Sequence, residues 1–406
     1  MNNGYIKTER AHIPGVFRED PFRLFFPSGL IVAMWGVFMW PAFYFDWLSF
    51  YPGLAHARLM IFGFMTALVC GFLGTAGPRI LEASPLSLRE LFLLYGAWLV
   101  GMIAYSMNAL LVGDCALLVA GLIGAFLAGG RIRKRKDLPP PAFVLVLLGL
   151  FSAAVALSLH IALQLGGLPG IDGFVVQELA RLLGYEAYLL LPVLGIGLFL
   201  IPRFGGLAPA QQTPDSRVPN AEWVRQALIA GGFGVFILAT YGMQVFVDGV
   251  GWEAGVVRFI VVVSWVVLRL PLRFRKEATG TIGRLARASV FFVLLGVLVS
   301  SWWNGSHAIA ARHLLLLGGY GLLGLCVVSW VVLAHSGCKE TAKRPNWAIR
   351  LAGFWVLVAL GTRLVGGYME SIRESHYIYA AFAWCLGIIC LLWILWPRFW
   401  VVEKED

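Results

Sequence analysis

The chain has 406 residues, of which 59% are hydrophobic and only 13% charged, and its mean hydropathy is +0.79. Soluble domains carry about 25% charged residues, so the composition excludes a soluble globular protein and predicts an all-α, polytopic membrane protein. The formal net charge is +10. Because the Lys and Arg residues crowd into alternate loops, they indicate membrane topology, and we expect no nucleic acid as a partner.

Apolar segments of about 20 residues, bounded by glycine, proline or charge, follow one another along the chain. They predict a bundle of about twelve transmembrane helices, at roughly 24–46, 56–77, 90–107, 110–129, 141–163, 176–201, 226–247, 252–270, 284–303, 307–333, 347–367 and 376–397. Residues 1–23 lack the apolar core of a signal peptide, so we expect the first span to be retained. We predict one integral membrane domain, 1–406, with two six-helix halves, 1–203 and 221–406, joined by the loop 204–220.

The loops differ in charge in a way that predicts their side of the membrane. One alternate set contains nearly all loop Lys and Arg, including the run Arg131–Lys136, whereas the other set contains only Arg373. The positive-inside rule then places both termini in the cytoplasm. We predict a multi-pass protein of the cell inner membrane, in contact with the lipid bilayer and with an even number of spans.

This topology brings ionisable residues to one depth, near the outer ends of the spans. Five of the seven histidines fall in that layer: His56, His160, His307, His313 and His376. The same layer contains Arg58, Arg181, Arg258, Arg312 and Arg363, with Glu178 and Glu186 as the nearby acids. His335 falls at the opposite face. Because charged groups in hydrocarbon need partners, either these glutamates or the carboxylates of a bound ligand must offset the arginines.

Imidazoles beside arginines are the residues that a membrane haem requires. Histidine supplies an axial nitrogen to the iron, and arginine binds propionates through paired hydrogen bonds. Copper accepts imidazole as well. His307 and His313 project about 120° apart on a helix, so we do not expect them to share a metal unless the helix is broken there. His376 is expected to cap its helix or form a hydrogen bond at the interface.

Several short motifs together resemble the NnrS family. They are Pro21–Phe26 before the first span, His56–Phe64 continuing to Gly71–Ala76 in the second, His160 in the fifth, Ile201–Phe204 ending the sixth, His313 and His335–Gly337 at the two ends of the tenth, and Arg363 in the eleventh. The resemblance covers most of the chain. It implies a twelve-helix inner-membrane protein that binds haem and copper and acts in nitric oxide or denitrification physiology.

Carried over by position, the family's histidines are His56, His160, His313 and His335. The chain departs from the family at three places. Arg58 and Leu59 replace the second histidine and the glutamate of a His-x-His-Glu motif, Phe199 stands where an arginine precedes Ile-Pro, and a ninth-span histidine is missing near Arg284 and Arg287. A smaller ligand set weakens the expectation of copper more than that of haem.

We therefore predict a haem, b-type, near the periplasmic surface, with copper as an additional candidate. The predicted metal ligands are His56, His160 and His313, with His307 and His335 as further candidates, and the predicted propionate partners are Arg58, Arg181, Arg312 and Arg363. The predicted function is binding or processing of nitric oxide or a similar small ligand, with enzymatic turnover left open. Three alternative functions remain: electron transfer by a bis-histidine haem with a respiratory partner, transport of a small anion, and delivery of haem or copper to a reductase. A homo-oligomer is compatible with all of them.

Overall fold

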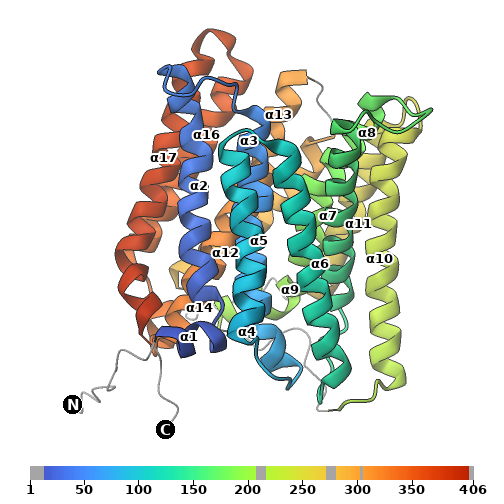
Figure 1. Cartoon of the computed structure of the whole chain (residues 1–406), viewed down its shortest axis with the longest axis vertical. Helices are drawn as coiled ribbons and strands as arrows, with labels where there is room; N and C mark the ends of the chain where they lie inside the picture. Colours follow the sequence, from blue (N-terminus) through green and yellow to red (C-terminus); the bar gives the residue numbers. More distant parts are fainter. Residues whose placement is uncertain (1–12, 207–215, 271–279, 302–304, 402–406) are drawn as a thin grey trace.

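Among the residues described by the computed structural model, twelve helices are long and apolar enough to cross a membrane, as the sequence predicts. The structure describes residues 13–206, 216–270, 280–301 and 305–401, and no strand occurs in these ranges. The helices run side by side as a bundle (Figure 1). The fold therefore defines a multi-pass, all-helical membrane protein.

The first six spans belong to the amino-terminal part of the chain. They are α2 (Phe22–Tyr44), α3–η1–α4 (Gly53–Arg58, Leu59–Met65, Thr66–Ile80), α5 (Leu88–Ser106), α6 (Leu110–Lys134), α7 (Phe143–Gln164) and α8–η2–α9 (Gly173–Arg181, Leu182–Ala187, Tyr188–Phe204). The short helix α1 (Ile13–Glu19) precedes them.

The last six spans follow a connection of which residues 207–215 lie outside the described ranges. They are α10 (Ala221–Phe246), α11 (Gly251–Arg269), α12 (Thr281–Val299), α13–η4–α14 (Gly305–His313, Leu314–Gly321, Leu322–His335), α16 (Trp347–Tyr368) and α17 (Arg373–Leu395). Three short elements complete them: α15 (Lys339–Lys343), η5 (Glu370–Ile372) and η6 (Trp396–Trp400). Helices of the two sets pack together, α2 against α17 and α7 against α10. The division into six-helix halves stays a prediction.

Spans two, six and ten form the interior of the bundle. Their most apolar windows are 61%, 83% and 78% buried, compared with 28–56% for the other nine described spans. Each of the three changes from α-helix to π-helix directly after an arginine or histidine: at Arg58 before η1, at Arg181 before η2 and at His313 before η4. A π-helical turn inside a helix is rare and often marks a functional site.

The π-helical segments present backbone carbonyl groups to side-chain donors. In η1 the carbonyl oxygen of Gly63 accepts a hydrogen bond from Trp98 Nε1 at 3.1 Å. In η2 the Leu183 oxygen accepts from the Ser152 hydroxyl at 2.8 Å, and the Glu186 oxygen accepts from the Tyr320 hydroxyl at 3.2 Å. Since lipid offers no water to satisfy such groups, these neighbouring side chains make the irregular backbone tolerable at membrane depth.

Glycines allow the central helices to approach their neighbours closely. A Cβ placed on Gly296 of α12 would lie 2.5 Å from the backbone nitrogen of Leu315 in η4. The Gly318–Gly321 stretch, predicted from the sequence to serve close packing, likewise touches Phe292, Val293 and Trp384. Small residues at helix crossings are typical of membrane bundles.

We expect Gly296→Ala to destabilise the protein by about 1–3 kcal/mol, because the added methyl group meets backbone that cannot rotate away. Gly361→Ala in α16 is the matched control, since nothing lies within 4 Å of the position that its added methyl group would occupy. Unfolding in detergent by titrated sodium dodecyl sulfate measures both variants. Equal stability of Gly296→Ala and the parent protein would contradict the close crossing.

Candidate functional site

The predicted site residues other than His335 gather at one end of the bundle. Figure 1 places α3, α8 and α13, which carry His56, Arg181 and Arg312, at the upper end, and α1 at the lower end. The side chains nevertheless divide into three clusters with different partners. The site is therefore a layer of separate groups, and only some of the predicted residues meet.

The first cluster joins spans two, ten and eleven through His56, His313 and Arg363. The Nδ1 atom of His56 lies 2.8 Å from the carbonyl oxygen of Gly36, and that of His313 lies 2.7 Å from the carbonyl oxygen of Ile309. A carbonyl oxygen can only accept a hydrogen bond, so in each neutral ring Nδ1 holds the proton and Nε2 keeps its lone pair. This is how second-shell groups orient a ligating histidine.

The histidines of this cluster share a cation. His313 lies within electrostatic range of both Arg363 and His56, and His56 lies within range of Arg363. Arg363 packs over the ring of Tyr377 at 4.0 Å, and its Nη1 is buried without a hydrogen-bond partner. Within the described residues it forms no ion pair. An anion that joined this guanidinium would offset the cost of burying its charge.

Aromatic rings enclose the same cluster. The Trp40 ring lies 5.9 Å from the His56 ring and 5.2 Å from the Tyr377 ring, measured between centroids. Tyr51 meets Trp40 edge-on at 5.4 Å. These side chains come from α2, α17 and the loop before α3, and they give the cluster flat, mainly apolar walls that suit a planar ligand.

The second cluster lies around Asp114, a carboxylate inside the apolar helix α6. Arg58 donates from Nε and Nη2 to the two Asp114 oxygens at 2.8 and 3.0 Å. Tyr105 and Gln164 also donate to Asp114, each at 2.8 Å. His160 lies within electrostatic range of Arg58 and Asp114. Arg58 thus has a carboxylate partner within the protein. The burial of Arg58 is explained by this partner, without the predicted binding of a haem propionate.

Two polar atoms in this cluster lack partners. Arg58 Nη1 and His160 Nε2 are both buried and form no hydrogen bond in the described structure. The His160 ring lies 6.1 Å from that of Tyr185. The structure therefore groups His160 with Arg58 and not with His56 and His313.

The third cluster pairs the arginines of spans six and ten with two glutamates. Arg181 donates to both oxygens of Glu178, and its Nη1 lies 3.6 Å from Glu186. Arg312 lies 3.3 Å from Glu186 and 3.8 Å from Glu178. Of the two explanations left open by the sequence, the glutamates account for these two arginines. Glu186 is 1% exposed and lies between both guanidiniums.

Arg258 lies near this third cluster without joining its ion pairs. It is fully buried over the Tyr241 ring and donates to Gln244 at 2.8 Å and to Ser301 at 2.6 Å. Tyr241 in turn lies within electrostatic range of Glu186. These neutral acceptors satisfy only part of the hydrogen-bonding capacity of the Arg258 side chain, because its Nε is buried without a partner, and no carboxylate is bonded to it in the described structure.

The remaining histidines lie apart from the three clusters. His307 stacks on Tyr368, with centroids 5.0 Å apart and planes 10° apart. The π-helix η4 begins only after His313, so the helix between these two histidines is unbroken, and no shared metal is expected. His376 forms a hydrogen bond near the start of its helix, because its Nδ1 lies 3.0 Å from the carbonyl oxygen of Ile372 one turn earlier, and its position at the membrane interface stays a prediction.

His335 lies at the opposite end of the bundle, beside α1 and α2. Its Nδ1 lies 3.0 Å from Asp20, which also pairs with Arg79 and Arg23. Burial raises the pKa of Asp20, but the hydrogen bond and electrostatic interaction with His335, together with the nearby Arg23 and Arg79, outweigh it, so this pKa lies below its ordinary value. A role for His335 as a ligand in the upper layer is not compatible with this position.

Arg23 completes this lower cluster and connects it to the end of the chain. Its side chain is fully buried and donates to the carbonyl oxygens of Phe399 and Val401, both at 2.8 Å, and to that of His335 at 3.0 Å. The first span is thereby fastened to the last.

The donor sets favour haem over copper. No group of three or more His, Cys, Asp or Glu side chains that could hold a metal ion occurs in the described ranges. Haem iron needs at most two protein ligands, because the porphyrin supplies the others, and His56 and His313 offer two free nitrogens beside an unpaired arginine. The residues present therefore fit a haem, whereas copper stays a prediction without a donor set.

Sequence reasoning did not single out Asp114, Trp40 or Tyr377. A carboxylate within an apolar span was a usable signal for Asp114, since such a residue is expected to have a cationic partner. Nothing in the sequence distinguishes Trp40 and Tyr377 from the aromatic residues that anchor spans at interfaces, because their role depends on which helices pack around His56.

The fold and the site together define the class of protein. It is a multi-pass helical membrane protein whose central spans carry buried clusters of histidine and arginine. The family model described as NnrS protein matches residues 16–402. The chain therefore belongs to the NnrS family, as its motifs indicate. No match is found among curated proteins.

Proposed function

We propose that this NnrS-family protein binds one haem, b-type, between spans two and ten, where His56 and His313 would hold the iron and Arg363 would bind a propionate. One observation carries the proposal: both histidines hold Nδ1 to a backbone carbonyl and leave Nε2 free, beside an arginine without a carboxylate. Trp40 and Tyr377 would contact the edge of the porphyrin ring of this haem.

The distribution of positive charge among the loops supports a position for this haem near the periplasm. The lower end of the bundle carries the basic loops, and the positive-inside rule assigns that end to the cytoplasm. Both termini would then be cytoplasmic and the protein would reside in the inner membrane. The His56–His313–Arg363 cluster lies at the other end.

Membership of the NnrS family supports a role in nitric oxide physiology, in nitrosative stress or denitrification. Bound haem supplies an iron centre that binds nitric oxide or a related small ligand and can change oxidation state. The residues of the chain hold and orient the haem, offset its propionate charge and keep water away from one end of the site.

The test is an absorption spectrum of the purified protein before and after anaerobic addition of nitric oxide, with a pyridine haemochrome assay for haem type and amount. We expect one b-type haem per chain and a shift of its main absorption band with nitric oxide. The His56→Ala/His313→Ala double variant is the control. Protein produced with ample haem that nevertheless contains none would overturn the proposal.

A second candidate function, electron transfer, is favoured by the pairing of two histidines on different spans. The haem would bind nitric oxide only where the gas displaces one of these histidines. If both stay on the iron, the haem would instead exchange electrons with a quinol or another respiratory partner. A low-spin spectrum that does not change with nitric oxide, but is reduced by quinol, would select this function. No comparable observation favours anion transport, because Arg58, Arg181 and Arg312 already pair with acidic side chains.

A further inference from the structure

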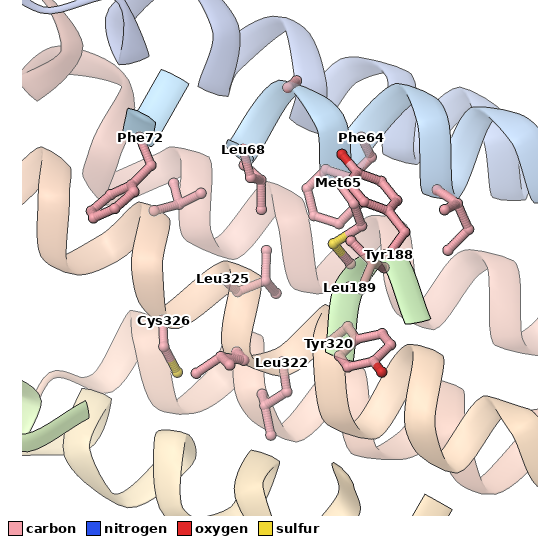
Figure 2. Close-up of a cluster of buried hydrophobic side chains, with 14 of the residues drawn as sticks. Phe64, Met65, Leu68, Phe72, Tyr188, Leu189, Tyr320, Leu322, Leu325 and Cys326 are labelled. Atoms are coloured by element: carbon pink, nitrogen blue, oxygen red, sulfur yellow. The ribbon is translucent and has the colours of Figure 1, made fainter. Parts of the chain in front are cut away.

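A cavity lies in the middle of the bundle, where spans two, six and ten meet. Its volume is about 100 Å³. Met65 at the end of η1, Leu68 in α4, Leu189 in α9 and Tyr320 in η4 contribute to its walls. Figure 2 shows these side chains facing one another from the three spans. The cavity thus begins where two of the three π-helical segments end.

The cavity is lined by apolar side chains and is open on one side. Met65, Leu68, Phe72 and Leu189 are each at most 7% exposed, whereas four lining residues are partly exposed: Val69, Val193, Ile196 and Val327. The one polar group among them, the Tyr320 hydroxyl, donates to the Glu186 carbonyl oxygen. A water molecule needs two to four polar partners, so water is disfavoured here.

The size of the cavity limits what it can hold. An apolar cavity of about 150 Å³ in another protein stays dry and binds benzene or xenon. At about 100 Å³, this cavity has room for one or two molecules of diatomic size, but none for a lipid tail of ordinary length. An empty cavity of this volume would also forfeit many dispersion contacts.

We infer that this cavity is a binding site for small apolar molecules, with dissolved diatomic gases as the ligand class. Met65 and Tyr320 lie roughly two turns beyond His56 and His313 along the same two spans. The cavity would then hold gas taken up from the bilayer close to the proposed haem. This link to gas chemistry rests on the proposed function, whereas occupancy of the cavity does not.

Xenon is a suitable probe, because it reports apolar cavities and needs no haem. The protein is labelled with ¹³C in its methionine methyl groups and placed in lipid nanodiscs under xenon pressure. Met65, which lines the cavity, is the reporter and is assigned with Met65→Leu. Met102 is an internal control, because it is 3% exposed but packs against Gly63 elsewhere in the core.

We expect a saturable xenon-induced shift of the Met65 methyl signal and none of the Met102 signal. Val327→Phe fills the cavity from α14 and should abolish the Met65 shift, and Val69→Phe from the opposite wall is the second variant if the first does not fold. The control is the same exchange at Val119, which is half exposed on α6, and it should leave the shift intact.

Two results would overturn the inference. Either no shift of Met65 at saturating xenon, or contacts of its methyl group with lipid acyl chains in place of xenon, would exclude a gas site. Both measurements are made on protein without haem as well as with it. A protein that binds no haem but shows the xenon shift therefore contradicts only the proposed function.

Discussion

Replacing His56 or His313 by alanine is expected to lower the haem content of the purified protein by more than about 10-fold. Loss of even a second-shell partner typically weakens metal sites about 10–100-fold, and here an axial ligand itself is removed. The Nε2 atoms of these two histidines are the free nitrogens beside the unpaired Arg363. The pyridine haemochrome assay, normalised to protein, measures the loss.

Two matched variants and one rescue make this experiment specific. His160→Ala and His335→Ala should retain haem, because these residues lie in clusters around Asp114 and Asp20. Adding imidazole to His56→Gly should restore the spectrum if the ring alone is missing. Full haem in both alanine variants, or equal loss in His160→Ala, would show that the ligands are assigned wrongly.

Asp114→Ala is expected to destabilise the protein by about 3–5 kcal/mol. Removing one partner of a buried ion pair leaves the other charge uncompensated, and Arg58 is only 4% exposed. Tyr105→Phe removes one hydrogen bond to the same carboxylate and should destabilise by only about 1 kcal/mol. Titration with sodium dodecyl sulfate in detergent gives the free energy of unfolding for each variant.

A double replacement separates charge from packing at this site. Arg58→Met combined with Asp114→Leu should recover most of the stability, since apolar residues often replace a buried pair without loss. Glu222→Gln is the exposed control; it breaks the surface pair with Arg225 and should cause no measurable change. If Asp114→Ala is as stable as the parent protein, the cluster does not hold spans two and four together.

The number and limits of the spans could be predicted from the sequence because membrane thickness fixes the length of an apolar helix. The second span, expected at 56–77, is Gly53–Ile80, and the fifth, expected at 141–163, is Phe143–Gln164. The place of His56 and His313 near the start of their spans followed from the same count. These properties depend on local composition and on the bilayer, and need no knowledge of neighbouring helices.

The grouping of the site residues could not be predicted, because it depends on the direction in which each side chain points. Arg58 follows His56 by two residues, yet the two face different helices, α6 for Arg58 and α2 for His56. The π-helical segments add to this uncertainty. A change in the number of residues per turn after Arg58, Arg181 and His313 rotates every later side chain, and nothing in an apolar run such as Leu314–Leu317 signals it.

The anchoring of Arg23 has a consequence for biosynthesis. The carbonyl groups that receive its guanidinium belong to residues 399 and 401, which leave the ribosome after every span has been made. The first helix therefore enters the membrane with a cationic side chain whose final acceptors do not yet exist. The contacts between Arg23 and these carbonyl groups must therefore form among the last events of assembly. Chains released a few residues early would lack these contacts.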